Sequence, residues 1–182
     1  MLKKTILALA LLIPIGIVFS LKGLSYTDGN PPGCSGSPTD QQHCATNCHN
    51  EKNTIIKEEK GWIKSNIPET GYIPDSIYTI TLTAYGEPSA TKFGFEASPQ
   101  YATGKTAGKM IVTNAVEMKL VGGIKYITQI AGGVDGKGSR TWSFNWKAPV
   151  KGSGKLTFYG AFLIGGKPET AVTSSLEVNE KI

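Results

Sequence analysis

The chain has 182 residues, with 19 Lys and Arg against 14 Asp and Glu, so its formal net charge is +5 at neutral pH. Arg140 is the only arginine and the basic residues form no cluster, so the composition argues against a nucleic-acid partner. With only two histidines in the chain, a Ser-His-Asp catalytic arrangement is not supported. We therefore expect a protein that is not an enzyme.

Residues 1–25 have the layout of a secretory signal peptide, with a basic start, an apolar run over residues 6–19 and small residues at Ser20 and Ser25. The apolar run is shorter than the about 20 residues that a membrane-spanning helix needs. We expect an exported protein, located in the periplasm, outside the cell or at the cell surface. An uncleaved N-terminal anchor is the alternative, and no other stable membrane insertion is expected.

Residues 26–53 are rich in Gly, Pro, Ser, Asp and Asn and poor in large apolar residues, a composition typical of an irregular loop. Such a segment buries little of itself, so we expect its order to come from covalent links at its cysteines. The acidic residues in the loops of the chain lack the spacing of a calcium-binding loop. These are Asp28, Asp40, Glu51, Asp75 and Asp135.

The motif Cys44-Ala-Thr-Asn-Cys48-His49 carries the most specific chemistry in this loop. In c-type haem attachment, two thiols bond to the porphyrin vinyl groups and the adjacent histidine becomes an axial iron ligand. The usual spacing places two residues between the cysteines, whereas three lie between Cys44 and Cys48. The motif predicts a covalent haem c held by Cys44 and Cys48 with His49 on the iron, serving electron transfer or redox or ligand sensing.

Cys34 provides two alternatives to haem. In an exported protein it can form a disulfide with Cys44 or with Cys48, which would fix the loop and leave His49 without a metal. The second alternative is a zinc site made from the three cysteines and His49, although adjacent Cys48 and His49 are awkward tetrahedral ligands. The residues alone leave these alternatives open.

After residue 53 the hydrophobic pattern changes to a period of two, which is typical of half-buried strands. Turn signals rich in Gly, Pro and Asp separate the strands, and no helical period appears. We expect seven to nine short strands in an antiparallel sandwich or barrel. The segment 156–164 is apolar or small almost throughout, which favours a central strand covered on both faces. The alternating apolar sets are Tyr78, Ile80, Leu82 and Ala84; Phe93, Phe95 and Ala97; Val116, Met118 and Leu120; Trp142, Phe144 and Trp146; and Val172, Ser174, Leu176 and Val178.

Several residues that could serve a site have core packing as their expected role. Met110 and Met118 are the methionines available as a further iron ligand, but their positions in strand patterns favour packing. Trp142 and Trp146 are likewise expected in the core, and not in a sugar-stacking platform.

Four stretches of the strand region carry a resemblance to a known family: residues 71–83, 92–95, 142–149 and 154–161. Together they resemble the Reeler domain, and in particular the exported bacterial branch called choice-of-anchor V. In that branch a Gly-Ser/Ala-Pro loop, matched by Gly36-Ser-Pro38, precedes a Cys-x-x-Cys-His motif. The resemblance spans about residues 33–175 and implies an all-β, immunoglobulin-like β-sandwich, secretion, and a role in extracellular display or matrix contact.

The chain departs from this family pattern in two places. One is the extra residue between Cys44 and Cys48, and the other is Gln129, where many members carry a histidine. Two functional hypotheses follow from residues and resemblance together. One is an exported haem protein with a redox partner, and the other is a non-haem adhesion or interaction module whose cysteines form a disulfide and whose partner is a cell-envelope or matrix protein.

Overall fold

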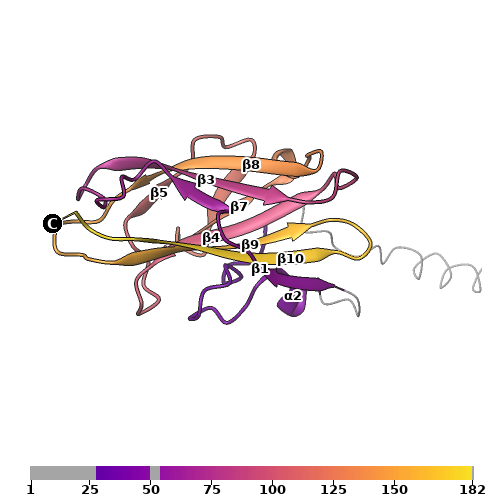
Figure 1. Ribbon diagram of the computed structural model, residues 1–182, viewed down its shortest axis with the longest axis horizontal. Helices are drawn as coiled ribbons and strands as arrows, with labels where there is room; N and C mark the ends of the chain where they lie inside the picture. The colour runs from indigo at the N-terminus through magenta and orange to yellow at the C-terminus, as the bar shows by residue number, and fades with distance from the viewer. Residues whose placement is uncertain (1–27, 50–53, 182) are drawn as a thin grey trace, which may run out of the picture.

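The computed structural model describes residues 28–49 and 54–181. The expected signal peptide, residues 1–25, and the expected boundary between the loop and the sandwich at residue 53 lie outside the described residues. Two β-sheets face each other and form a sandwich, as predicted (Figure 1). Within the described ranges, no helix is both long and apolar enough to cross a membrane.

Sheet A has six strands in the order β1-β10-β9-β4-β7-β6. All of its neighbouring strands are antiparallel except β1, which pairs in parallel with β10 through the register Ile55↔Thr170. The strands are β1 (Ile55–Glu58), β4 (Phe93–Gln100), β6 (Met118–Val121), β7 (Tyr126–Gln129), β9 (Leu156–Ile164) and β10 (Thr170–Val178).

Sheet B has four strands in the order β2-β3-β8-β5, all antiparallel to their neighbours. The long β3–β8 pair forms its centre, with Ile80 opposite Phe144. The strands are β2 (Ile63–Ser65), β3 (Ile77–Tyr85), β5 (Lys109–Ile111) and β8 (Ser139–Lys147). A 3-10 turn, η1 (Ala131–Gly133), follows β7.

The core lies between the two sheets and is rich in aromatic side chains. The predicted core residues Trp142 and Trp146 are fully buried, and their indole N–H groups donate to the carbonyl oxygens of Gly133 and Ala107, each at 2.8 Å. Met110 and Met118 are also buried. A buried indole keeps its donor satisfied in this way, so the packing carries no penalty for an unpaired polar group.

The outer face of sheet A is covered as well. On β4 the outward-facing residues Glu96, Ser98 and Gln100 are buried, although they alternate with the core residues. Residues 28–49, which we call the N-terminal segment, lie over this face with the short helix α2 (Cys44–Asn47) against β9 (Figure 1). Residues 156–164 form a central strand as predicted. Its core face is buried, whereas its outer face is covered only in part: Ala161 is buried, and Thr157, Tyr159 and Leu163 are half-buried.

Three local expectations differ from the structure. Val116 is 73% exposed and precedes β6, because the Asn114 side chain and carbonyl accept hydrogen bonds from the following residues and form a turn there. The described residues contain ten strands, more than the predicted seven to nine, because strands of three or four residues show too little alternation to detect. The predicted irregular loop also contains one helical turn, which the His43 imidazole caps by accepting from the N–H of Ala45 at 3.2 Å.

Candidate functional site

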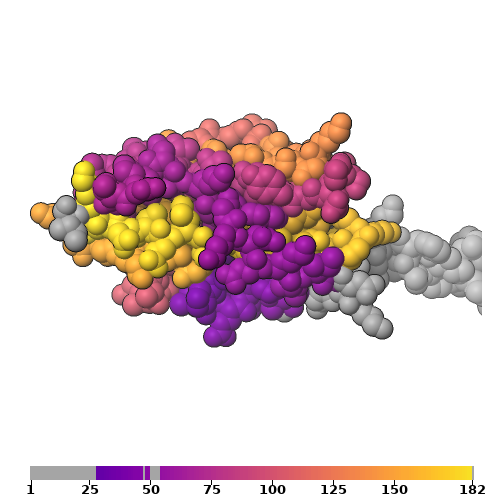
Figure 2. Space-filling view, in the orientation of Figure 1, coloured from indigo at the N-terminus to yellow at the C-terminus, as the bar shows by residue number. Residues whose placement is uncertain are grey.

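The N-terminal segment is attached to sheet A by hydrogen bonds to its outward-facing polar side chains. The Asn30 N–H donates to Thr128 Oγ1 at 3.2 Å, while the N–H groups of Gly33 and Cys34 donate to Glu96 Oε1 at 3.0 and 2.5 Å. Gly36 (φ +75°) lets the backbone come close, since a Cβ there would meet Thr173 Cγ2 at 2.8 Å. Figure 2 shows the indigo and violet atoms of this segment and β1 beside the yellow atoms of the C-terminal strands.

Asp40 is the second point of attachment. Its carboxylate accepts hydrogen bonds from Ser35 Oγ at 2.5 Å and from the Tyr126 hydroxyl at 2.7 Å, and Lys125 Nζ lies 3.5 Å away. Burial by itself would raise the pKa of Asp40, but the hydrogen bonds, chiefly from Ser35 and Tyr126, and the Lys125 charge outweigh burial and lower it. The Asp40 side chain is 3% exposed, so these interactions are poorly screened by solvent.

Glu96 is fully buried beneath the segment and is less well compensated than Asp40. Its Oε1 accepts the two backbone hydrogen bonds, whereas Oε2 has no hydrogen-bond partner among the described residues. Burial is the main cause that raises the pKa of Glu96 to about 7, against the lowering effect of those two hydrogen bonds. A carboxyl group with this pKa changes its charge state near neutral pH.

The three cysteines of the segment differ in exposure and carry free thiols in the structure. Cys44, the first residue of α2, is 5% exposed, and its Sγ accepts a hydrogen bond from Asn30 Nδ2 at 3.7 Å. Cys34 is half-buried and Cys48 is exposed. Burial raises the pKa of Cys44 to about 12 with a further contribution from Cys34, and burial followed by Glu96 and Cys48 raises that of Cys34 to about 11. The thiol of Cys34 is thus close enough to both other thiols to interact with them electrostatically.

His49 lies beside a carboxylate group of the β9–β10 hairpin. Its Nδ1 lies 2.9 Å from Glu169 Oε2, a contact that ties the end of the segment to the β9–β10 hairpin. Within residues 28–49 and 54–181, no group of three or more His, Cys, Asp or Glu is placed to hold a metal ion. The four zinc candidates of the segment therefore do not converge on one point in this structure.

The cysteine pair does not fit a covalently attached porphyrin in this arrangement. A haem bonded to both Cys44 and Cys48 needs both sulfur atoms on one accessible surface, but Cys44 lies in the interface between the segment and sheet A while Cys48 faces solvent. This geometry gives no support to the haem c predicted at Cys44, Cys48 and His49. Haem attachment remains a prediction, to be tested on the purified protein.

The residues that fasten the segment were missed by the analysis of the sequence. Asp40 was grouped with the scattered loop acids, and the order of the segment was expected to come from covalent links alone. Hydrogen bonds to Asp40 and Glu96 supply part of that order. The alternation of Glu96 and Ser98 with Phe95 and Ala97 indicates only the outward face of a strand, and not that the N-terminal segment covers it.

Comparisons with known proteins identify the class of fold. No protein-family model matches the sequence, and no curated protein matches it either. Among solved structures, the human F-spondin reeler domain is similar with a TM-score of 0.53 and 17% identity, covering 71% of this chain and 95% of that one. A second structure, of the Reelin-N domain of F-spondin, gives a TM-score of 0.54 at 17% identity, with coverage of 71% and 93%. The fold of this chain is accordingly a Reeler-like β-sandwich.

Proposed function

We propose that this protein is an exported, non-haem interaction module in which a Reeler-like sandwich presents a binding surface outside the cytoplasm. Its cysteines have a structural role: a disulfide between Cys34 and Cys44 fastens the N-terminal segment over sheet A. Cys48 is left as an exposed thiol. This is the second of the two hypotheses drawn from the sequence, and it accounts for the cysteines without a cofactor.

The observation that carries the proposal is the position of Cys44. Its sulfur faces Asn30 inside the interface and lies within electrostatic reach of Cys34, not on an accessible surface. An oxidising compartment favours closing such a pair, and the loop closed between Cys34 and Cys44 is short. By the chain-entropy argument a loop of this size contributes about 3 kcal/mol to stability.

Three further features support an interaction role. The layout of residues 1–25 is that of a secretory signal peptide. The sandwich is similar in fold to the reeler domain of human F-spondin. The sequence also resembles the exported choice-of-anchor V branch, for which display outside the cell is implied.

The deciding experiment is an intact mass and a visible spectrum of the protein purified from the exported fraction of a haem-competent host. We expect a colourless protein two mass units below the reduced mature chain, with peptide mapping that joins Cys34 to Cys44 and with Cys48 alkylated without denaturant. Cys44→Ser should abolish the link, whereas Cys48→Ser should preserve it.

A different result would reject this proposal clearly. A mass higher by one haem that survives denaturation, together with an absorbance band that shifts on reduction, would establish the haem protein instead. Cys34 would then be the unlinked cysteine, and His49→Ala would change the spectrum without releasing the covalent group.

A further inference from the structure

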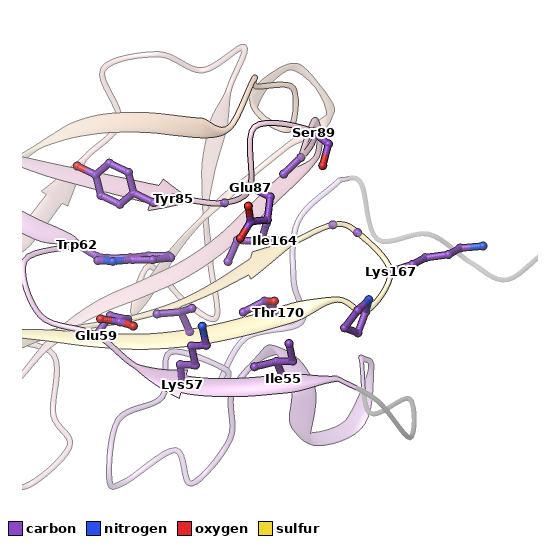
Figure 3. Close-up of a pocket in the computed structure, with 16 residues that line it drawn as sticks. Ile55, Lys57, Glu59, Trp62, Tyr85, Glu87, Ser89, Ile164, Lys167 and Thr170 are labelled. Carbon is purple, nitrogen blue, oxygen red and sulfur yellow. The ribbon is translucent and has the colours of Figure 1, made fainter.

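A groove opens at one edge of the sandwich, away from the N-terminal cysteines. It has a volume of about 440 Å³ and lies between β1, the β9–β10 hairpin, Trp62 and the loop that follows β3 (Figure 3). The core residues Ile164 and Val172 form part of the groove wall. A cavity of this volume is typical of sites for small ligands.

Trp62 is the aromatic residue at the centre of this groove. Its indole makes edge-to-face contacts with Phe162 at 5.2 Å and Tyr85 at 5.6 Å between ring centroids. Unlike Trp142 and Trp146, Trp62 donates its N–H to no acceptor within the part of the chain that the structure describes. Tyr85 is 50% exposed, so the two rings form an accessible aromatic corner.

Charged side chains surround this corner without neutralising one another. Figure 3 shows Lys57 and Glu59 on one side of the Trp62 ring, with Glu87 on the loop across the groove. Within residues 28–49 and 54–181, none of these three side chains forms an ion pair or a hydrogen bond. Lys167 of the β9–β10 hairpin also lines the groove and forms no ion pair among the described residues. Two carboxylates and two ammonium groups therefore remain free to bind a ligand, beside the Ser89 hydroxyl.

We propose that this groove binds a neutral oligosaccharide, an inference that names the ligand for the interaction module proposed above. The apolar C–H face of a pyranose ring packs on the indole of Trp62 and against the edge of Tyr85, burying apolar surface on both partners. Glu59 and Glu87 accept hydrogen bonds from sugar hydroxyls, and Lys57 and the Trp62 N–H donate to sugar oxygens. Charge-assisted hydrogen bonds of this kind are stronger than neutral ones.

The balance of charge and the backbone geometry select this ligand class over two others. The two carboxylates and two lysines of the lining balance, so the groove has no net positive charge to attract a polyanionic chain. An extended peptide would need unpaired backbone groups in the groove, but the N–H groups of Ile55 and Glu59 already donate to Glu169 and Thr173 at 3.0 and 2.9 Å. The groups that face the groove from β1 are its side chains.

The test uses the mature, oxidised protein and a panel of neutral hexasaccharides built from glucose, N-acetylglucosamine, mannose, galactose or xylose. Binding is followed by NMR through the indole N–H signal of Trp62, with the signals of Trp142 and Trp146 as internal references. We expect at least one hexasaccharide to shift the Trp62 signal saturably while the two buried indoles stay unchanged.

Substitutions then locate the site. Glu59→Gln and Glu87→Gln each remove a charged acceptor at unchanged size, so we expect each to weaken binding about tenfold. Glu58→Gln is the matched control: it lies next to Glu59 on β1 but is absent from the groove lining, and affinity should not change. Trp62→Phe retains a ring and removes the N–H donor, and it should weaken binding while the protein stays folded.

Three results would overturn the inference. They are no saturable shift with any hexasaccharide, equal affinity in Glu59→Gln and Glu58→Gln, or selection of extended peptides that shift the amides of Ile56 and Glu58 in place of the Trp62 indole. A colourless, disulfide-linked protein that binds none of the sugars rejects this inference alone. A haem-bearing protein rejects the proposed function, whatever the sugars do.

Discussion

Glu96 lies on the outer face of sheet A, where the N-terminal segment removes its side chain from solvent. Two backbone N–H groups satisfy one carboxylate oxygen, and the other is buried without a partner in the described residues. A buried carboxylate is costly unless it is fully hydrogen-bonded, so folding favours the protonated form. The pKa of Glu96 accordingly rises from its ordinary 4.5 to about 7.

This residue predicts a pH dependence of stability. Because the folded pKa lies above the unfolded one, the folded state binds more protons between pH 4.5 and 7, and stability decreases as pH rises through that range. Glu96→Gln keeps an acceptor for Gly33 and Cys34 and removes the titration. The free energy of unfolding of the variant minus that of wild type should increase by up to about 3 kcal/mol from pH 4.5 to pH 8. Urea unfolding of both proteins at each pH measures this difference.

The exposed Glu58→Gln serves as the control for that comparison, since it removes one carboxylate from the surface of β1. Its stability difference from wild type should stay nearly constant across the same pH range. Parallel pH profiles for wild type and Glu96→Gln would show that Glu96 does not titrate in this range.

At the scale of elements, the N-terminal segment behaves as a covering layer on sheet A. It has little regular structure apart from α2. Its buried and half-buried polar contacts with the sheet run from Asp40 to Tyr126 and Lys125 and from its other residues to Glu96, Gln100 and Thr128. An anchored layer of this kind can open locally without unfolding the sheet beneath it. Its stability is therefore expected to depend on a few residues.

Asp40→Ala tests this dependence. The change leaves the Tyr126 hydroxyl and the Ser35 hydroxyl without their shared acceptor, which should cost about 2 kcal/mol of local stability. We expect hydrogen exchange to accelerate in the backbone of residues 29–46 while β3 and β8 stay protected. Because the pKa of Asp40 is lowered in the folded state, the wild-type segment should also loosen as pH falls toward and below the usual range of an aspartate.

Asp28→Ala is the matched control, because Asp28 is an exposed acid of the same segment whose ion pair is with the partly exposed Lys119. Exposed ion pairs contribute little to stability, so the hydrogen exchange of residues 29–46 should hardly change in Asp28→Ala. Equal effects of the two substitutions would contradict the anchoring role of Asp40.

At the scale of the whole molecule, the two sheets are joined by aromatic packing. Trp146 on sheet B contacts Phe158 on sheet A, with ring centroids 5.0 Å apart, and Tyr72 at 5.5 Å. Its indole N–H also donates to the carbonyl oxygen of Ala107 in the loop that leads into β5. Removing this side chain therefore affects both layers together.

We expect Trp146→Ala to lower the free energy of unfolding by about 4 kcal/mol, measured by chemical denaturation of the whole protein. Trp62→Ala removes a side chain of the same size from the edge of the sandwich, where it is only partly buried, and should cost clearly less. A larger loss for Trp62 than for Trp146 would contradict the assignment of the core between the sheets.

The sequence by itself determined the fold class. Strands β3, β4, β8 and β10 alternate over eight or nine residues, and a period of two maintained over that length has one common explanation, a sheet with one face in a core. The continuous apolar run of β9 indicates a central strand instead. The core positions of Trp142 and Trp146 on β8 followed from the same period of two. The three- and four-residue strands β1, β2, β5, β6 and β7 carry too few alternations for this inference.

Only the tertiary structure decided the surroundings of the candidate sites. The burial of Cys44 depends on how a loop without periodicity lies over a sheet, which places it near Glu96 of β4 as well as Asn30 and Cys34 of its own segment. Asp40 meets Tyr126 through a separation of 86 residues. Trp62 lines a groove together with the loop after β3 and the β9–β10 hairpin, which lie far from it in the sequence. Local patterns encode which face of a strand is apolar, whereas contacts between distant segments arise only when the sheets have packed.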